Sequence, residues 1–118
     1  MSVVVNVWRR GLLTSNQRHH WAVRSRLTRE LRALSRYRHR DHPRYQRAAL
    51  GILVNFPDRR RRDVTNLAPT FKALIDGAID AGILPDDDDT HLTATTYRTG
   101  DPHGTAGIVR ITLEWSPA

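Results

Sequence analysis

Hydrophobic and polar positions recur along the chain in patterns that predict four strands and two helices. Residues 3–8, VVVNVW, are mostly β-branched and predict a strand. Residues 19–38 follow Ser15 or Asn16 as the expected N-cap, and their apolar side chains recur at helical spacing. These side chains are Val23, Leu27, Leu31 and Leu34. The other faces of this expected helix are rich in arginine.

The middle of the chain repeats the order of strand and helix. Residues 48–56, AALGILVNF, are continuously apolar, which predicts a short strand covered on both faces. Residues 67–81 carry an apolar stripe at helical spacing, which predicts a second helix packed on a core. Thr65 or Asn66 is its expected N-cap, and Gly82 follows as its expected C-terminal cap.

Two further strands are expected at residues 91–98 and 106–115, joined by the turn-forming sequence TGDPHGT. In the second of these, apolar and polar side chains alternate, so one face is expected to meet water. The resulting order is β-α-β-α-β-β. It predicts a single domain over residues 1–118 of the α/β (α+β) class, with a small mixed β-sheet packed with two main helices.

The composition excludes several classes of protein. No apolar run approaches the roughly 20 residues that a membrane helix needs, and no signal-peptide pattern opens the chain. Cysteine is absent, which excludes disulfides and thiolate metal sites. We therefore expect a cytoplasmic protein that has no membrane partner.

Charge is distributed very unevenly along the chain, whose net charge is +7. Residues 1–62 contain 16 arginines and three acids, a balance of +13. Residues 63–118 contain two arginines, one lysine and nine acids, a balance of −6. This asymmetry predicts a polyanion-binding surface beside an acidic feature. The alternative is a solvated basic helix from an arginine-biased genome.

The acidic feature centres on four consecutive aspartates at residues 86–89 and on Lys72, the only lysine. Carboxylates are the ligands that Mg²⁺ prefers, and a lysine neutralises charge that develops on a phosphate. These residue types predict Mg²⁺-dependent hydrolysis of nucleic acid, with Mn²⁺ as an alternative cofactor. The competing interpretation is a solvated loop, with Lys72, Asp76 and Asp80 forming ion pairs along one helix face. For His91, beside the acidic loop, we expect a structural role.

Three stretches of this chain resemble the RusA family of Holliday-junction endonucleases. They are "RRRRDVTNL", the lysine on the following helix, and "DAGILPDD". The upstream "TSNQRHHWAVRSRLTRELR" resembles the asparagine-containing turn and basic helix of the same family. The resemblance covers about residues 12–92. It implies a small α/β homodimer in a bacterial or phage-infected cell, which cuts four-way DNA junctions with Mg²⁺ during recombination or repair.

The resemblance also implies roles for individual residues. Asp63 matches the first catalytic aspartate, and Asn66 matches the asparagine that follows it in a structural role. Asp86 and Asp87 match the downstream pair, of which Asp87 is the expected catalytic one. Lys72 matches the catalytic lysine. Asp63, Asp86 and Asp87 are accordingly the expected metal ligands.

Two departures from the family pattern affect the expected site. Thr65 stands where the family has a second carboxylate, and it cannot replace an anionic ligand. The interval between the asparagine and the lysine is also longer by about three residues, APT. Either Asp86, Asp88 or Asp76 supplies the missing charge, or the site binds metal weakly.

Geometry separates the two halves of the expected site. Asp63 precedes the helix expected at 67–81 and Asp87 follows it, and a helix of that length spans roughly 22 Å at about 1.5 Å per residue. Ligands of one metal site must lie within a few ångströms of each other. The loop GILPDD could fold back over some of this distance, but it must also lead into the next strand. Pairing two copies of the helix antiparallel in a homodimer would place Asp63 of one subunit beside Asp87 of the other. We therefore expect active sites shared between subunits.

The leading hypothesis is a Mg²⁺-dependent, structure-selective endonuclease that acts on branched DNA. Arginines of the first helix and of the loop after the second strand are expected to bind phosphates. They are Arg24, Arg29, Arg32, Arg36, Arg59, Arg60, Arg61 and Arg62. A second hypothesis, favoured by Thr65, is a catalytically weak or silent junction-binding protein of the same fold. A third is a metal-dependent nuclease directed at RNA.

Overall fold

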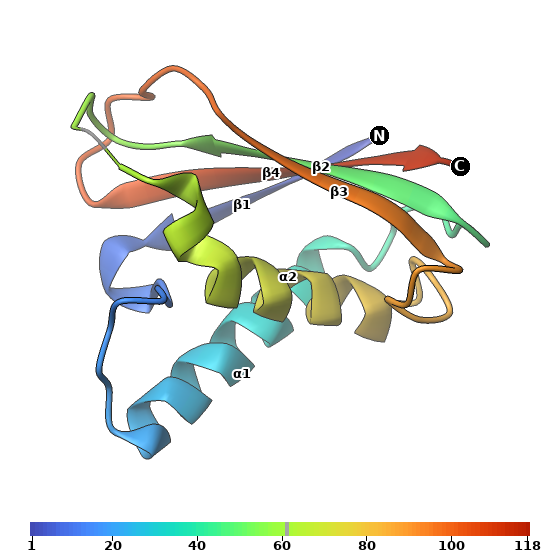
Figure 1. The fold of residues 1–118 in the computed structure, drawn as a ribbon, viewed down its shortest axis with the longest axis horizontal. Helices are drawn as coiled ribbons and strands as arrows, with labels where there is room; N and C mark the ends of the chain where they lie inside the picture. The colour runs from blue at the N-terminus through green and yellow to red at the C-terminus, as the bar shows by residue number, and fades with distance from the viewer. Residues whose placement is uncertain (61) are drawn as a thin grey trace.

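A four-stranded sheet lies over two helices in the computed structural model, which describes residues 1–60 and 62–118 (Figure 1). This arrangement confirms the predicted fold class and the predicted order of elements. The elements are β1 Ser2–Trp8, α1 Trp21–Arg38, β2 Ala48–Asn55, α2 Ala68–Asp80, β3 Leu92–Thr99 and β4 Ile108–Pro117. Two short 3₁₀ helices, η1 Arg9–Gly11 and η2 Val64–Leu67, precede α1 and α2 respectively.

The sheet is mixed, with the strand order β1-β4-β2-β3. Strand β4 pairs antiparallel with both β1 and β2, whereas β2 and β3 run parallel. The parallel pair requires a crossover connection, which α2 supplies. As a result, β3 and β4 are consecutive in the sequence but are separated in the sheet by β2.

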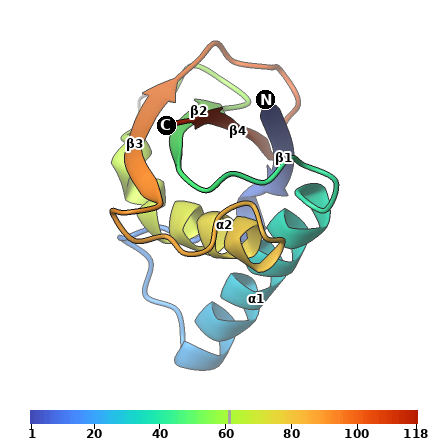
Figure 2. The same ribbon diagram turned by 90° about the vertical axis from the view of Figure 1, so that its right-hand side faces the viewer.

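Both helices cover the same face of the sheet, which arches over α2 when viewed from its end (Figure 2). Alternate residues of β2, such as Leu50, Ile52 and Val54, are buried beneath this arch. The intervening residues, such as Ala49 and Leu53, point to the other face and are half-exposed. The prediction that residues 48–56 are covered on both faces is therefore wrong for the single chain. The run reads as continuously apolar because the half-exposed face also carries small or apolar side chains.

The two helices approach each other most closely at Gly77 of α2. A Cβ atom built there would lie 2.3 Å from the backbone oxygen of Arg32 on α1, so only glycine permits this contact. Arg32 also binds Asp80 through two hydrogen bonds, Nε to Oδ2 at 2.5 Å and Nη2 to Oδ1 at 2.8 Å. These contacts hold the middle of α1 against the C-terminal half of α2.

The caps of both helices differ from the predicted ones. The N-cap of α1 is His20, whose Nδ1 accepts a hydrogen bond from the backbone of Ala22, and the predicted caps Ser15 and Asn16 lie further upstream. Ahead of α2, the side chain that caps is Asp63, at the start of η2, rather than Thr65 or Asn66. At the other end of α2 the prediction is confirmed, because Gly82 has a φ of +90° and turns the chain.

His39 lies at the centre of a buried polar network that joins α1, α2 and β4. Trp115 donates from Nε1 to His39 Nε2 at 3.0 Å, so Nδ1 carries the ring proton and donates to Ser35 O at 2.8 Å. Ser35 in turn donates from its hydroxyl to the backbone oxygen of Leu74. Burial disfavours the charged imidazolium and lowers the pKa of His39 to about 4. His39 is therefore a neutral core residue at physiological pH.

We predict that His39 makes stability depend on pH in the mildly acidic range. The pKa of His39 in the folded chain lies below the ordinary histidine value of 6.5, so the unfolded chain takes up the proton first as the pH falls. Stability should be fully present above about pH 6.5 and decline between pH 6.5 and 4, by at most about 3 kcal/mol. Urea unfolding at several pH values measures this decline. A His39→Gln variant should show a shallower decline than the parent, whereas His19→Gln, at an exposed site, should not change it.

Candidate active site

The acidic loop after α2 folds back along the helix and brings Asp87 to Lys72. Lys72 Nζ donates to Asp87 Oδ2 at 2.5 Å and to Asp76 Oδ1, one turn further along α2, at 3.0 Å. The reversal begins at Gly82 and is anchored by Ile83 and Leu84, which are both buried. Helix spacing and a buried loop anchor thus place two carboxylates on one lysine.

Charge pairing sets the ionisation of this group. The hydrogen bonds that Lys72 donates to Asp87 and, to a smaller extent, to Asp76 raise the pKa of Lys72. The hydrogen bond from Lys72 lowers the pKa of Asp87. Asp86 lies directly beside the pair, and its Oδ1 accepts a hydrogen bond from the backbone of Asp87 at 2.7 Å. Three carboxylates and one ammonium group therefore occupy one surface next to α2. We call Lys72, Asp76, Asp86 and Asp87 the lysine cluster.

Asp88, predicted as a substitute metal ligand, instead closes the turn into β3. Its Oδ1 accepts hydrogen bonds from the backbone of Thr90 and of His91, at 3.1 and 3.2 Å. The same oxygen lies 2.7 Å from His91 Nδ1. His91 therefore contacts Asp88 rather than the lysine cluster, in keeping with the structural role expected for it.

Asp63 lies in a separate group at the start of η2. Its Oδ1 accepts hydrogen bonds from the backbone and the hydroxyl of Thr65, at 3.0 and 2.7 Å. The hydroxyl bond is the main reason that the pKa of Asp63 is lowered. Asn16 and Asn66 line the same hollow as Asp63. We call Asn16, Asp63 and Asn66 the asparagine hollow.

Buried hydrogen bonds hold the segment around Asn16 against the start of α2. The hydroxyl of Thr70 accepts from the backbone N–H of Leu13 and donates to the backbone oxygen of Leu13, both at 2.7 Å. Ser15 donates from its backbone to Asn66 O at 2.9 Å. The structure thus brings together the TSNQ turn and the RDVTNL segment, residues 62–67, which lie about 50 residues apart and both belong to the stretches that resemble the RusA family.

The lysine cluster and the asparagine hollow are not brought together within one chain. Between Asp63 and Lys72 lie η2 and the first turn of α2, roughly 14 Å of helix at about 2.0 and 1.5 Å per residue. In residues 1–60 and 62–118, no group of three or more histidine, aspartate or glutamate side chains is placed to hold a metal ion. The oxygen donors suit Mg²⁺ in type, but one protomer does not assemble Asp63, Asp86 and Asp87 into a single ligand set.

Some of the arginines predicted to bind phosphate are paired with an acidic side chain among the described residues, and others are not. On α1, Arg24, Arg29 and Arg36 form no ion pair with the described part of the chain. Arg32 is occupied by its two hydrogen bonds to Asp80 and is thus part of the contact between the helices. On α1, the side chains available to bind phosphate are therefore Arg24, Arg29 and Arg36.

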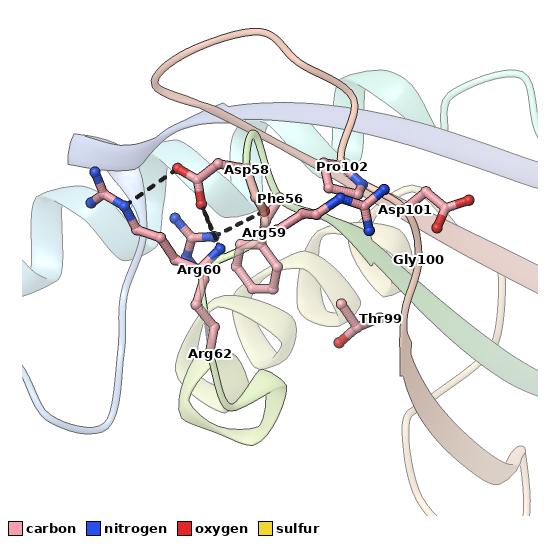
Figure 3. Close-up of a pocket in the computed structure, with 9 residues that line it drawn as sticks. All are labelled: Phe56, Asp58, Arg59, Arg60, Arg62, Thr99, Gly100, Asp101 and Pro102. Atoms are coloured by element: carbon pink, nitrogen blue, oxygen red, sulfur yellow. Dashed lines mark hydrogen bonds and ion pairs between the residues drawn. The ribbon is translucent and has the colours of Figure 1, made fainter.

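Two arginines of a second group, Arg60 and Arg62, flank Asp58 in the loop after β2 (Figure 3). Arg62 Nη1 lies 2.6 Å from Asp58 Oδ1, and its guanidinium stands 4.7 Å from the centre of the Phe56 ring. Arg60 Nε lies 3.7 Å from the other oxygen of Asp58. Arg59 is exposed at the rim of the same pocket. Arg61, also predicted to bind phosphate, lies outside the described residues.

The organising role of Asp58 was not anticipated from the sequence. The signal was present, since Asp58 stands two residues before Arg60 and four before Arg62. The pairs with both arginines lower the pKa of Asp58, chiefly through the Arg62 hydrogen bond. Asp58 therefore orients a loop that would otherwise carry four mutually repelling cations.

Comparison with known proteins adds no family assignment. No protein-family model matches the chain, and no curated protein matches it significantly. The resemblance to the RusA family therefore stays a prediction from the residues quoted above. In the part of the chain that the structure describes, no helix combines the length and the apolarity required to cross a membrane.

We predict that removal of Lys72 raises the pKa of Asp87 and leaves that of Asp63 unchanged. In Lys72→Met, Asp87 loses the hydrogen bond and the positive charge that stabilise its carboxylate, so its titration midpoint should move upward toward the ordinary aspartate range. Asp63 is an internal control, because Thr65 and not Lys72 lowers its pKa. NMR titration of the carboxyl carbons in the presence of a chelator measures both. Equal shifts at the two aspartates would contradict the separation of the two groups.

Proposed function

We propose that the protein is a divalent-cation-dependent endonuclease that cuts branched DNA, including four-way junctions. The observation that supports this most strongly is the lysine cluster, in which Lys72 contacts Asp76 and Asp87 beside Asp86. Carboxylates beside an ammonium group suit phosphodiester hydrolysis, because the carboxylates hold a cation and the lysine stabilises charge that develops on the phosphate. The resemblance of the same segment to the RusA family supports the same chemistry.

The distribution of charge supports a nucleic-acid substrate. Arg24, Arg29 and Arg36 on α1, with the loop arginines around Asp58, provide cations that bind the phosphate backbone without reading bases. Binding of this kind recognises the shape and charge density of DNA. Selectivity for a junction then depends on how these surfaces are placed rather than on base sequence.

In this proposal, Mg²⁺ or Mn²⁺ would polarise the scissile phosphodiester and activate a water molecule when bound. Asp86 and Asp87 are the proposed ligands from one subunit, and Asp63 is the proposed ligand from the other. Lys72, which contacts Asp76 and Asp87, would stabilise the charge that develops on the phosphate. Arginine side chains hold the strand on either side.

Sharing of the site between two subunits is supported by the separation of its halves. Asp63 and Lys72 are separated by η2 and the first turn of α2, and in residues 1–60 and 62–118 the carboxylates of the asparagine hollow and the lysine cluster are not gathered into one group that could hold a metal ion. A two-fold homodimer would provide two equivalent sites, as symmetric cutting of a four-way junction requires.

A second candidate function is a junction-binding protein without nuclease activity. Thr65 favours it, because this residue occupies the place of a carboxylate in the family pattern and its hydroxyl binds Asp63. Such a protein would use the same arginines and the same fold. The two candidates differ only in whether a divalent cation induces cleavage.

We predict that Asp87→Asn abolishes cleavage of a labelled four-way junction while preserving its binding. Loss of a carboxylate at the proposed metal site should lower the rate by about 100-fold or more. The dissociation constant for the junction should stay the same or decrease, because one negative charge near the phosphates is removed. Cleavage in Mg²⁺ and in Mn²⁺, with binding measured in a chelator, provides both values. Asp89→Asn is the matched control, since it makes the same change at an exposed neighbouring residue.

The cleavage assay also separates the two candidate functions. An unsubstituted protein that binds the junction but never cuts it with either cation would support the silent junction-binding protein. Loss of binding in Asp87→Asn, with normal binding in Asp89→Asn, would instead assign Asp87 to the stability of the loop.

We predict that mixing two inactive variants restores activity. In heterodimers of Asp63→Asn with Asp87→Asn, both substitutions fall in one shared site and the other site keeps its full set of carboxylates. Up to about half of the subunit pairs should then carry one active site if exchange is random. Nicking of the junction by the refolded mixture, compared with each variant alone, measures this. If every site belongs to one chain, the mixture will stay as inactive as its components.

A further inference from the structure

Two of the three tryptophans lie on the surface, which is unusual for the largest apolar side chain. Trp115 is 1% exposed and belongs to the core, whereas Trp8 is 66% exposed and Trp21 is 75% exposed. Trp21 stands at the first position of α1 with its ring 5.6 Å from that of His20. Trp8 stands at the end of β1, where the chain turns into η1. The two exposed tryptophans differ in their contacts, because Trp8 packs against Gly107 whereas Trp21 has only His20 beside it among the described aromatic rings.

The Trp8 ring is seated against the backbone of Gly107. A Cβ atom at Gly107 would lie 3.3 Å from Cζ3 of Trp8, and the φ of Gly107 is +78°, so glycine both makes room for the ring and suits the turn. Arg9 donates from its backbone to Gly107 O at 2.8 Å, which fixes the two segments together. One side of the ring is thus supported, while most of its surface faces solvent.

Cations surround this ring. Trp8, Arg9, Arg10 and Gly107 line one surface hollow. Arg9 also lines the neighbouring hollow, which contains Arg60 and Arg62 and shares Leu12, Phe56 and Arg62 with the hollow that holds Asp63. In the described part of the chain, neither Arg9 nor Arg10 forms an ion pair with an acidic side chain. The aromatic surface is therefore continuous with the arginine loop.

Charge argues for a polyanion rather than a second copy of the chain on this surface. A second copy that met this surface with its own copy of the same surface would bring Arg9 and Arg10 against the same two arginines, which is electrostatically unfavourable. A nucleic-acid strand brings phosphates for the arginines and flat aromatic bases for the indole. Aromatic rings beside cations are the usual combination in proteins that bind single strands, because every base can stack.

We propose that Trp8 is a stacking site for an unpaired nucleobase, with Arg9 and Arg10 binding the adjacent phosphates. This inference rests on the proposed function and identifies the part of the substrate that this surface recognises. Branch points expose bases that duplex DNA keeps stacked inside the helix. A stacking site beside the arginine loop would distinguish a branched or gapped strand from continuous duplex.

Tryptophan fluorescence tests the proposal without any need for cleavage. A Trp21→Phe protein retains Trp8 as its exposed reporter, and a Trp8→Phe protein retains Trp21 as the matched control. Each is titrated in chelator with a short oligothymidylate, with an abasic strand of equal length, and with a continuous duplex. Trp8 fluorescence should be quenched by the oligothymidylate but much less by the abasic strand or the duplex. Trp21 fluorescence should change little with any of the three.

Affinity provides the second readout. Trp8→Ala should weaken binding of the oligothymidylate by about 5-fold or more and binding of the abasic strand by much less. Thermal unfolding and gel filtration of Trp8→Ala verify that its fold and mass are unchanged. Equal quenching by the abasic strand, or an unchanged affinity for the oligothymidylate, would overturn the proposal. A dimer that dissociates in Trp8→Ala, with no quenching by DNA, would overturn it in favour of a contact between subunits.

The outcomes also separate this inference from the proposed function. Quenching of Trp8 by unpaired bases in a protein that cuts no junction with Mg²⁺ or Mn²⁺ would retain the stacking site and reject the nuclease. Junction cleavage that depends on Asp87, together with an unquenched Trp8, would retain the nuclease and reject the stacking site.

Discussion

Packing of α2 beneath the sheet determines where the carboxylates of this protein lie. The apolar stripe of α2 is buried by β2 and its neighbours, and Gly77 allows α1 to press against it from the other side. A helix held in this way is a rigid rod of set length. Its start carries the asparagine hollow, and its exposed flank carries the lysine cluster. The fold of one chain therefore keeps the asparagine hollow and the lysine cluster at different places along α2.

Ion pairs in this chain serve two different purposes. Arg32 with Asp80, and Arg62 with Asp58 and Phe56, hold elements of the fold in place. Lys72 with Asp87 differs in position rather than in exposure, because its aspartate lies in the acidic loop that folds back on α2. Ion pairs at the surface contribute little to stability, so the side chains of Lys72 and Asp87 can separate at a small cost in free energy. A lysine that can leave its aspartate suits the proposed chemistry.

The spacing of apolar residues predicted the structure correctly where the burial of a side chain follows from the local sequence. It located both helices, all four strands and the Gly82 turn to within a few residues. It failed for the coverage of β2, because an apolar run does not reveal whether its second face is occupied by protein. It also failed for the caps of α1 and α2. At these N-termini His20 accepts from the backbone of Ala22, and Asp63 accepts from the backbone and the hydroxyl of Thr65, which are local hydrogen bonds that periodicity does not encode.

By itself, the sequence determined the fold class, the lopsided charge and the residue types available for phosphate chemistry, since these follow from composition and spacing. The separation expected between Asp63 and Asp87, roughly 22 Å of helix, was too long. The loop after α2 folds back and brings Asp87 to Lys72, in the first half of the helix. Only the tertiary structure decided that Lys72 would meet Asp87, that Asp88 would close a turn, and that Trp8 would rest on Gly107 beside the arginine loop. Each of these depends on how a loop returns to the body of the protein. That path is set by buried anchors distant in the sequence, such as Ile83 and Leu84, and not by the local pattern.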